Sequence, residues 1–148
     1  MLYLVRGRGG ASYPLEDLAD LDPAEGPAAH LALMDTRWDE AWRAENPDLA
    51  AMIIERFATS AASPGPGQRL QLEARSRHDT SHRLGTLGCP TLVAGGRYDG
   101  IAPLANSEFL ARSIPGAHLR LFDGGHGFFL QDPEALPAIT SFLATPNP

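Results

Sequence analysis

Asp99 and His126 are the two residues of this sequence whose types and surroundings best suit proton transfer. Asp99 ends the motif Gly-Gly-Arg-Tyr-Asp after one apolar run, and His126 stands in Gly-Gly-His-Gly-Phe-Phe after another. A carboxylate that binds one ring nitrogen of a histidine fixes its tautomer, so that the other nitrogen can act as a general base. The two residues therefore predict an acid–histidine pair.

The segments around this pair predict one strand–helix–strand unit. The runs 91–94 and 118–122 are typical of short parallel strands. A helix is expected between them over about 103–114, because proline suits a first helical turn. Open α/β sheets place their sites at the carboxyl edge of the strands. We therefore expect Asp99 and His126 to be neighbours there, within about 3.2 Å of each other.

Both residues also have ordinary structural explanations. Asp99 and Gly100 form a dipeptide that is a strong hairpin-turn signal. Pro103 and the helical pattern after it count against a hairpin. His126 could be a simple histidine in a glycine turn, since its glycine neighbours let the chain bend sharply.

Other polar residues are weaker candidates. Asp123 could cap a turn instead of taking part in chemistry. His78 and His82 have the i, i+4 spacing of metal ligands, but no third ligand is evident, so we predict no metal site. Arg97 and Tyr98, beside the acid, could hold the loop or contact a substrate.

The motifs around Asp99 and His126 resemble the acid and histidine of the α/β-hydrolase fold family. That family has the chain order nucleophile, acid, histidine. The chain as a whole looks like the C-terminal half of lid-bearing members, similar to enol-lactone hydrolases and proline iminopeptidases. The resemblance implies hydrolysis of an ester, lactone, amide or C–C bond in a small-molecule substrate by a Ser-His-Asp triad. It implies no cofactor.

A nucleophile is missing from this pattern. The family's nucleophile stands in Gly-x-Ser-x-Gly between a strand and a helix. The nearest match is Gly10-Ala11-Ser12-Tyr13-Pro14, and we interpret Ser12 as a turn serine. We therefore expect the isolated chain to be inactive or nearly so. Three hypotheses follow: a truncated or split hydrolase chain, a catalytically silent binding or assembly module, or an enzyme completed when another chain supplies the serine.

The predicted architecture is a partial α/β-hydrolase fold, with about three parallel strands, flanking helices and an inserted helical lid. Residues 1–12 should hold the first strand, Leu2–Val5, and a turn. Residues 13–83 should form the lid, and residues 84–148 the α/β core that carries the acid and the histidine.

Two tryptophans stand out in the predicted lid. A single helix is expected over 27–44, and Leu31, Met34, Trp38 and Trp42 recur at helical spacing along it. Trp38 and Trp42 could line a pocket for an apolar substrate group, and Tyr98 of the acid loop is a further candidate for substrate binding. The alternative is that the tryptophans pack the lid onto the core.

Composition excludes several classes of function. The chain has 148 residues with a net charge of −6, and all 12 basic residues are arginine. This balance disfavours nucleic-acid binding, and without lysine there is no Schiff-base chemistry. One cysteine excludes an internal disulfide. No apolar run approaches the length of a membrane helix, and we expect a cytoplasmic protein.

Self-association is also expected. The strand Leu2–Val5 would leave one edge unpaired, with neither proline nor charge to block it. We therefore predict a homo-oligomer, most simply a twofold dimer joined at this edge.

Overall fold

The computed structural model describes residues 11–14, 17, 25–60 and 66–145. In chain order the elements are α2 (Gly26–Met34), α3 (Glu40–Glu45), α4 (Pro47–Ser60), α5 (Pro66–Arg77), the 3₁₀ helix η1 (Ser81–Thr86), β1 (Leu92–Gly96), α6 (Leu104–Ser113), β2 (His118–Phe122), α7 (Phe128–Gln131) and α8 (Ala135–Ala144). The fold class is α/β, as the sequence predicts.

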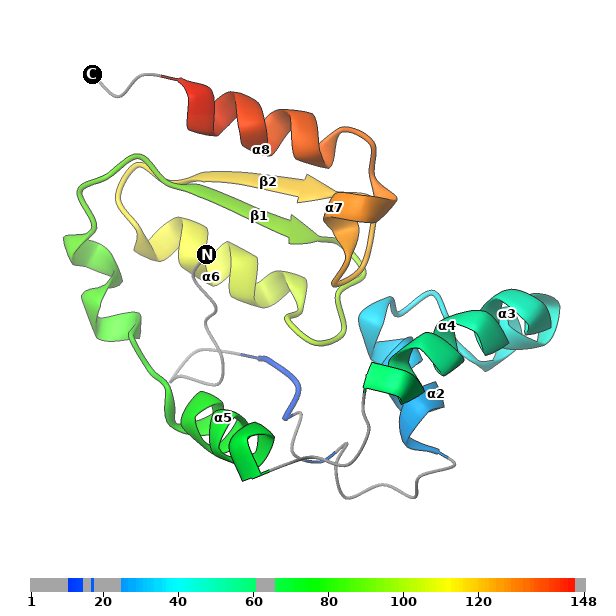
Figure 1. The fold of residues 1–148 in the computed structure, drawn as a ribbon. Coiled ribbons are helices and arrows are strands. Elements are labelled where there is room, and N and C mark those ends of the chain that lie inside the picture. The colour runs from blue at the N-terminus through cyan, green and yellow to red at the C-terminus, as the bar shows by residue number, and fades with distance from the viewer. Residues whose placement is uncertain (1–10, 15–16, 18–24, 61–65, 146–148) are drawn as a thin grey trace.

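The strands β1 and β2 form a parallel pair in which Leu92 lies opposite His118 and Gly96 opposite Phe122. The crossover helix α6 joins them, so the predicted strand–helix–strand unit is confirmed. Figure 1 shows α6 on one face of the sheet and α8 on the other. Both strands therefore end at one edge, from which the loops at 97–103 and 123–127 emerge.

A buried cluster anchors the opposite end of this unit. Leu84 of η1 and Ile114, just after α6, are 2% and 4% exposed. Partly buried apolar side chains pack against them: Leu87, Phe109, Leu110 and Ala117. This cluster holds η1 against α6 and so fixes where β1 begins.

The single helix expected over 27–44 is wrong, because the chain breaks into α2 and α3. Asp35 is the residue that follows α2, and its carboxylate accepts a hydrogen bond from the backbone N–H of Arg37 at 3.0 Å. Asp39 then caps α3 by accepting from the N–H of Trp42 at 2.8 Å. Aspartate side chains compete with helical backbone bonds in this way, and they favour caps and turns over helix interiors.

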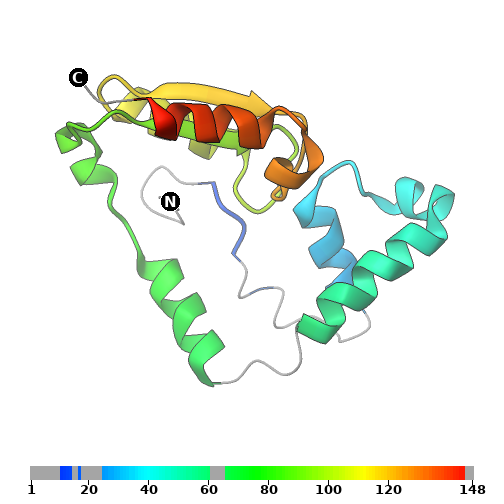
Figure 2. The same cartoon turned by 45° about the horizontal axis from the view of Figure 1, so that its top comes forward.

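The helices α2, α3 and α4 lie together beyond the carboxyl edge of the sheet, whereas α5 lies apart from them (Figures 1 and 2). Their mutual packing is centred on Leu31 and Ala50, which are 0% and 4% exposed. We call α2–α4 and their connections the cap block. The predicted domain boundaries at 12 and 83 stay predictions.

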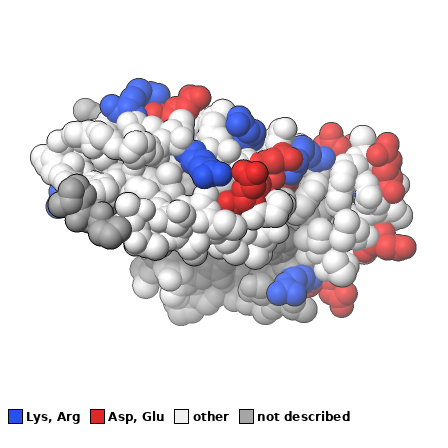
Figure 3. Space-filling view, turned by 90° about the horizontal axis from the view of Figure 1, so that it is seen from above, with Lys and Arg blue, Asp and Glu red and all other residues white. Residues whose placement is uncertain are grey.

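Seen from the α8 side, charged side chains are sparse over the sheet and more frequent toward the cap block (Figure 3). Leu136 and Leu143 of α8 are 50% and 74% exposed.

Among the described residues, none of the helices is both long enough and apolar enough to cross a membrane. The expected strand Leu2–Val5 lies outside the described residues, so the dimer at its edge stays a prediction.

Candidate active site

Asp99 and His126 meet at the carboxyl edge of the sheet. The Nδ1 atom of His126 lies 2.9 Å from Oδ2 of Asp99, so the expected hydrogen-bonding distance is confirmed. The Asp99 side chain is buried at 8% exposure, and that of His126 is more open at 28%. With Nδ1–H donating to the carboxylate, Nε2 is the nitrogen that can accept a proton.

The loop after β1 holds Asp99 through its second oxygen. Oδ1 accepts hydrogen bonds from the backbone N–H groups of Ile101 and Ala102, at 2.9 and 2.7 Å. Asp99 therefore starts a turn that leads into α6. The hairpin alternative for Asp99-Gly100 is wrong, because a helix and not an antiparallel strand follows.

The loop after β2 packs directly against the end of β1. The N–H of Tyr98 donates to the carbonyl of Gly124 at 3.0 Å, and the N–H of Arg97 donates to Phe122 at 3.1 Å. A Cβ atom at Gly96 would collide with the carbonyl oxygens of Gly124 and Gly125. The two loops are thus in backbone contact, and only glycine at position 96 permits it.

A third segment, residues 33–37 at the end of α2 and the start of the α2–α3 connection, touches both loops. The carbonyl of Leu33 accepts from the N–H of Gly100 at 3.0 Å, and the carbonyl of Met34 accepts from the N–H of His126 at 2.6 Å. A Cβ atom at Gly125 would collide with the Met34 carbonyl and the Asp35 backbone. The cap block therefore contacts the backbone of His126 itself.

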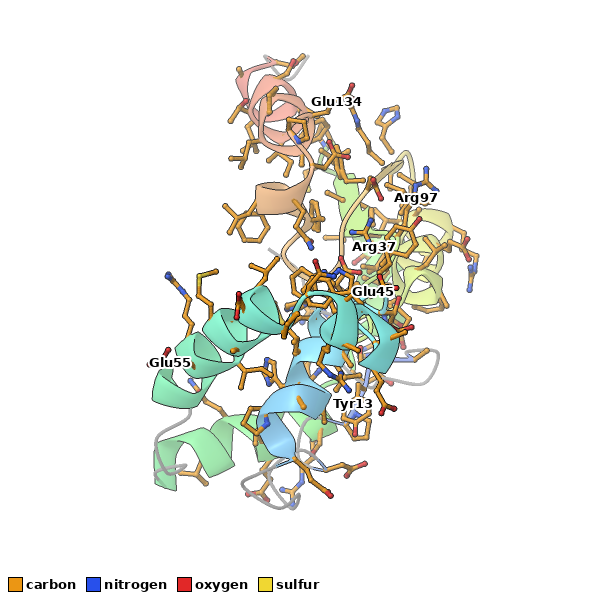
Figure 4. The ribbon with its side chains drawn as sticks, turned by 90° about the vertical axis from the view of Figure 1, so that its right-hand side faces the viewer. Tyr13, Arg37, Glu45, Glu55, Arg97 and Glu134 are labelled. Carbon is orange, nitrogen blue, oxygen red and sulfur yellow. The ribbon has the colours of Figure 1, made fainter. Side chains whose placement is uncertain are left out.

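Asp35 and Arg37 are the two charged residues of this segment. Burial alone would raise the pKa of Asp35, but hydrogen bonds and the positive charge of Arg37, with a hydrogen bond from Gln131, hold it below its ordinary value of 3.8. Arg37 also bonds Asp123 at 3.0 Å, and its guanidinium lies 4.1 Å from the centre of the Tyr98 ring. Figure 4 shows Arg37 between the cap block and the edge of the sheet.

Sequence reasoning missed Asp35, Arg37 and Gln131. A usable signal was present, since Asp35 follows Leu31-Ala-Leu-Met34 and lies four residues after the buried Leu31. A charged residue on the apolar side of an expected helix calls for a partner. The partner Gln131 stands about a hundred residues later, in a helix that the sequence did not predict.

A cavity of about 210 Å³ opens beside the histidine loop. Its walls come from the cap block and from α7, and they are mostly apolar: Met34, Trp38, Ile53, Gly127, Leu130 and Gln131. Of the predicted substrate residues, the structure places Trp38 here. Trp42 stacks on Trp38 with ring centres 5.6 Å apart, and Tyr98 packs under Arg37.

His30 of α2 lies near the histidine of the site. Burial, and second the positive charge of His126, lower the pKa of His30. The cap block thus brings a second imidazole into the electrostatic range of His126. Both effects favour the neutral form of His30 when His126 is charged.

Ser12 lies beside the acid loop with a structural partner. Its hydroxyl accepts a hydrogen bond from Nδ2 of the buried Asn106 at 2.8 Å, and Oδ1 of Asn106 accepts from the N–H of Ala11. The N–H of Tyr13 donates to the carbonyl of Ile101 at 2.9 Å. These contacts suit the interpretation of Ser12 as a turn serine.

Comparison with known proteins gives a consistent picture. The family model of the alpha/beta hydrolase fold matches residues 11–133. The chain is 40% identical over 78 residues to a poly(3-hydroxyalkanoate) depolymerase of Ectopseudomonas oleovorans, covering 52% of this chain and 28% of that protein. It is 34% identical over 90 residues to a pimeloyl-(acyl-carrier protein) methyl ester esterase of Neisseria meningitidis, covering 59% and 35%.

Solved structures agree with this match. A hydrolase from Pseudomonas aeruginosa superposes with a TM-score of 0.68 at 26% identity, covering 89% of this chain and 49% of that one. The enol-lactonase of Burkholderia xenovorans shares the fold with a TM-score of 0.67 at 22% identity, covering 89% and 49%. The chain spans about a third of the length of these curated relatives and about half of these solved chains.

Replacing Gly125 with alanine should displace the histidine loop, because the new Cβ has no room against the backbone at Met34 and Asp35. We expect a loss of about 1–3 kcal/mol in the free energy of unfolding, as in other overpacked sites, measured by urea denaturation. Gly127→Ala is the matched control, since its nearest contact would be Gln131 at 3.9 Å. Equal stability of the two variants would contradict the close approach.

The depressed pKa of Asp35 predicts an acid-sensitive contribution to stability. A carboxyl group whose folded pKa lies below its unfolded pKa stabilises the fold fully above the unfolded value, about 3.9, and loses this effect as the pH falls through the folded value. The stability advantage of the native chain over Asp35→Asn should therefore be largest near neutral pH and shrink below about pH 4. Urea denaturation from pH 7 to pH 3 measures it; a constant difference would contradict the assignment.

Proposed function

This chain belongs to the alpha/beta hydrolase fold family, and from that membership we propose that it supplies the acid and the histidine of a Ser-His-Asp hydrolase site. The single observation that carries the proposal is the 2.9 Å hydrogen bond between Asp99 and His126. It lies at the carboxyl edge of the sheet, where this class of fold places its sites. The buried acid and the more open histidine fit the two roles.

The proposed roles follow from the orientation of the pair. Nε2 of His126 takes the proton of a serine hydroxyl as that oxygen attacks the substrate carbonyl carbon, and the imidazolium then donates the proton to the leaving group. A water molecule repeats the cycle on the acyl-enzyme. Asp99 orients the imidazole ring and stabilises the imidazolium, while the N–H groups of Ile101 and Ala102 hold its other oxygen.

We propose that the serine comes from outside these 148 residues, either from preceding sequence or from a second chain. The sequence contains no Gly-x-Ser-x-Gly, and the Ser12 hydroxyl accepts a hydrogen bond from the buried Asn106. A site without its nucleophilic serine should be nearly inactive, because removing the nucleophile of such a triad costs on the order of a million-fold in kcat.

The proposed substrate carries a small apolar group next to an ester, lactone or amide carbonyl. The cavity beside the histidine loop, which Gly127 helps to line, is about 210 Å³, and its walls include Met34, Trp38 and Leu130. Among the similar proteins, one is named as a methyl ester esterase and another as a poly(3-hydroxyalkanoate) depolymerase. Trp38 is the residue we propose for the apolar contact, with Trp42 supporting it from behind through the stacked rings.

The proposal predicts a requirement for both residues once a nucleophile is present. The chain would be mixed with a separately produced N-terminal segment of an alpha/beta hydrolase that carries Gly-x-Ser-x-Gly, and p-nitrophenyl acetate turnover measured. Where turnover appears, Asp99→Asn and His126→Ala should each lower kcat by about a thousand-fold or more.

Two controls accompany this measurement. Asp48→Asn, an exposed carboxylate in the first turn of α4, should leave the restored turnover unchanged. The chain alone should hydrolyse the ester no faster than its His126→Ala variant. Activity of the chain alone that depends on His126 would place the nucleophile within these residues, and restored turnover that survives His126→Ala would remove the histidine from its role.

A further inference from the structure

A buried carboxylate stands directly behind the histidine loop, and the roles proposed above do not use it. Asp35 is 0% exposed, yet its two oxygens accept hydrogen bonds from Arg37 Nε at 2.9 Å, from Arg37 Nη2 at 2.7 Å and from Gln131 Nε2 at 2.9 Å. The backbone N–H of Arg37 adds another at 3.0 Å. The charge is thus fully partnered inside the protein.

The Gln131 side chain carries this contact to the residue before His126. Its Nε2 donates to Asp35, and its Oε1 accepts from the backbone N–H of Gly125 at 2.8 Å. The next N–H, that of His126, donates to the carbonyl of Met34. Two successive N–H groups of the histidine loop are therefore held by residues 34–35, one directly and one through an amide.

Arg37 connects the same carboxylate to both loops of the site. Its Nη1 donates to Asp123 at 3.0 Å, at the start of the histidine loop, and its guanidinium covers the ring of Tyr98, the residue before Asp99. Thr36, between Asp35 and Arg37, donates its N–H to the carbonyl of Tyr98 at 2.9 Å. One short segment thus contacts the neighbours of both catalytic candidates.

A contribution to folding stability does not by itself explain the buried carboxylate of Asp35. Replacing a buried ion pair with apolar residues is often neutral or stabilising, whereas directional polar bonds define geometry that apolar packing leaves loose. A displacement of about 1 Å in a catalytic group can cost a hundred-fold in rate. A site that needs His126 at one distance from Asp99 gains from hydrogen bonds that fix the backbone N–H groups of two successive residues, Gly125 and His126.

We infer that Asp35, Arg37 and Gln131 form a clamp that sets the position of His126 against Asp99, and that they are positioning residues of the site. The inference rests on the proposed function for its purpose, but its physical content is the geometry of the Asp99–His126 hydrogen bond. That bond can be observed directly, without turnover and without a nucleophile.

The test uses the whole chain labelled with ¹⁵N-histidine. The proton on Nδ1 of His126 should give a downfield NMR resonance that marks its bond to Asp99, assigned by its absence in His126→Gln. Gln131→Met keeps the length of the side chain and removes both amide contacts. We expect this variant to lose the resonance while it stays folded, and the signals of the exposed His118, at the far end of β2, should not change.

Matched variants separate positioning from general weakening of the cap block. Arg43→Gln removes an arginine of α3 that bonds the Trp38 carbonyl and should keep the His126 resonance. Gln131→Leu removes the same two amide contacts at a similar side-chain volume, and it should lose the resonance as Gln131→Met does.

The outcomes are distinct. A folded Gln131→Met that keeps the resonance overturns the clamp and leaves the proposed function intact. Loss of the His126 resonance in Arg43→Gln, to the same extent as in Gln131→Met, has the same consequence. A folded Gln131→Leu that keeps the resonance likewise overturns the clamp. Absence of the resonance from the native chain removes the acid–histidine bond, and with it the proposed function.

Discussion

Backbone contact among three loops is the constraint on which the candidate site depends. The loop after β1 carries Asp99, the loop after β2 carries His126, and the segment 33–37, at the end of α2, lies against both. Any side chain at Gly96 or Gly125 would enter space already filled by neighbouring backbone. The bond between acid and histidine follows from this approach, since two short strands alone place the loops only at the same edge.

Two carboxylates flank the histidine loop, and each has a different set of hydrogen-bond donors. Asp99 is held by two backbone N–H groups and the imidazole, whereas Asp35 is held by a guanidinium and an amide. A buried charge without such partners would cost several kcal/mol or would be neutralised. Each carboxylate therefore stabilises the loop around it only while its own donors stay in place.

Local sequence patterns were enough to predict the strand–helix–strand unit from β1 to β2 and the proximity of Asp99 to His126. Short strands, a helix that begins with proline and glycine-rich loops are all determined by residues close in sequence. They were not enough for the cap block. The break between α2 and α3 occurs at Asp35, whose partner Gln131 is distant in sequence. Helix α7, a single turn at Phe128–Gln131, is too short for periodicity to reveal.

Residues 34–38 both line the apolar cavity and contact the loop that carries His126. Met34 and Trp38 line the apolar cavity. Asp35 and Arg37 lie between them in sequence: Asp35 binds Gln131 of α7, and Arg37 contacts Asp123 of the histidine loop and Tyr98 of the acid loop. A substitution that reshapes the cavity at position 34 or 38 therefore acts on backbone that also holds His126. Interactions that share one segment are rarely additive. In this fold, the fit of a substrate and the alignment of the base should change together.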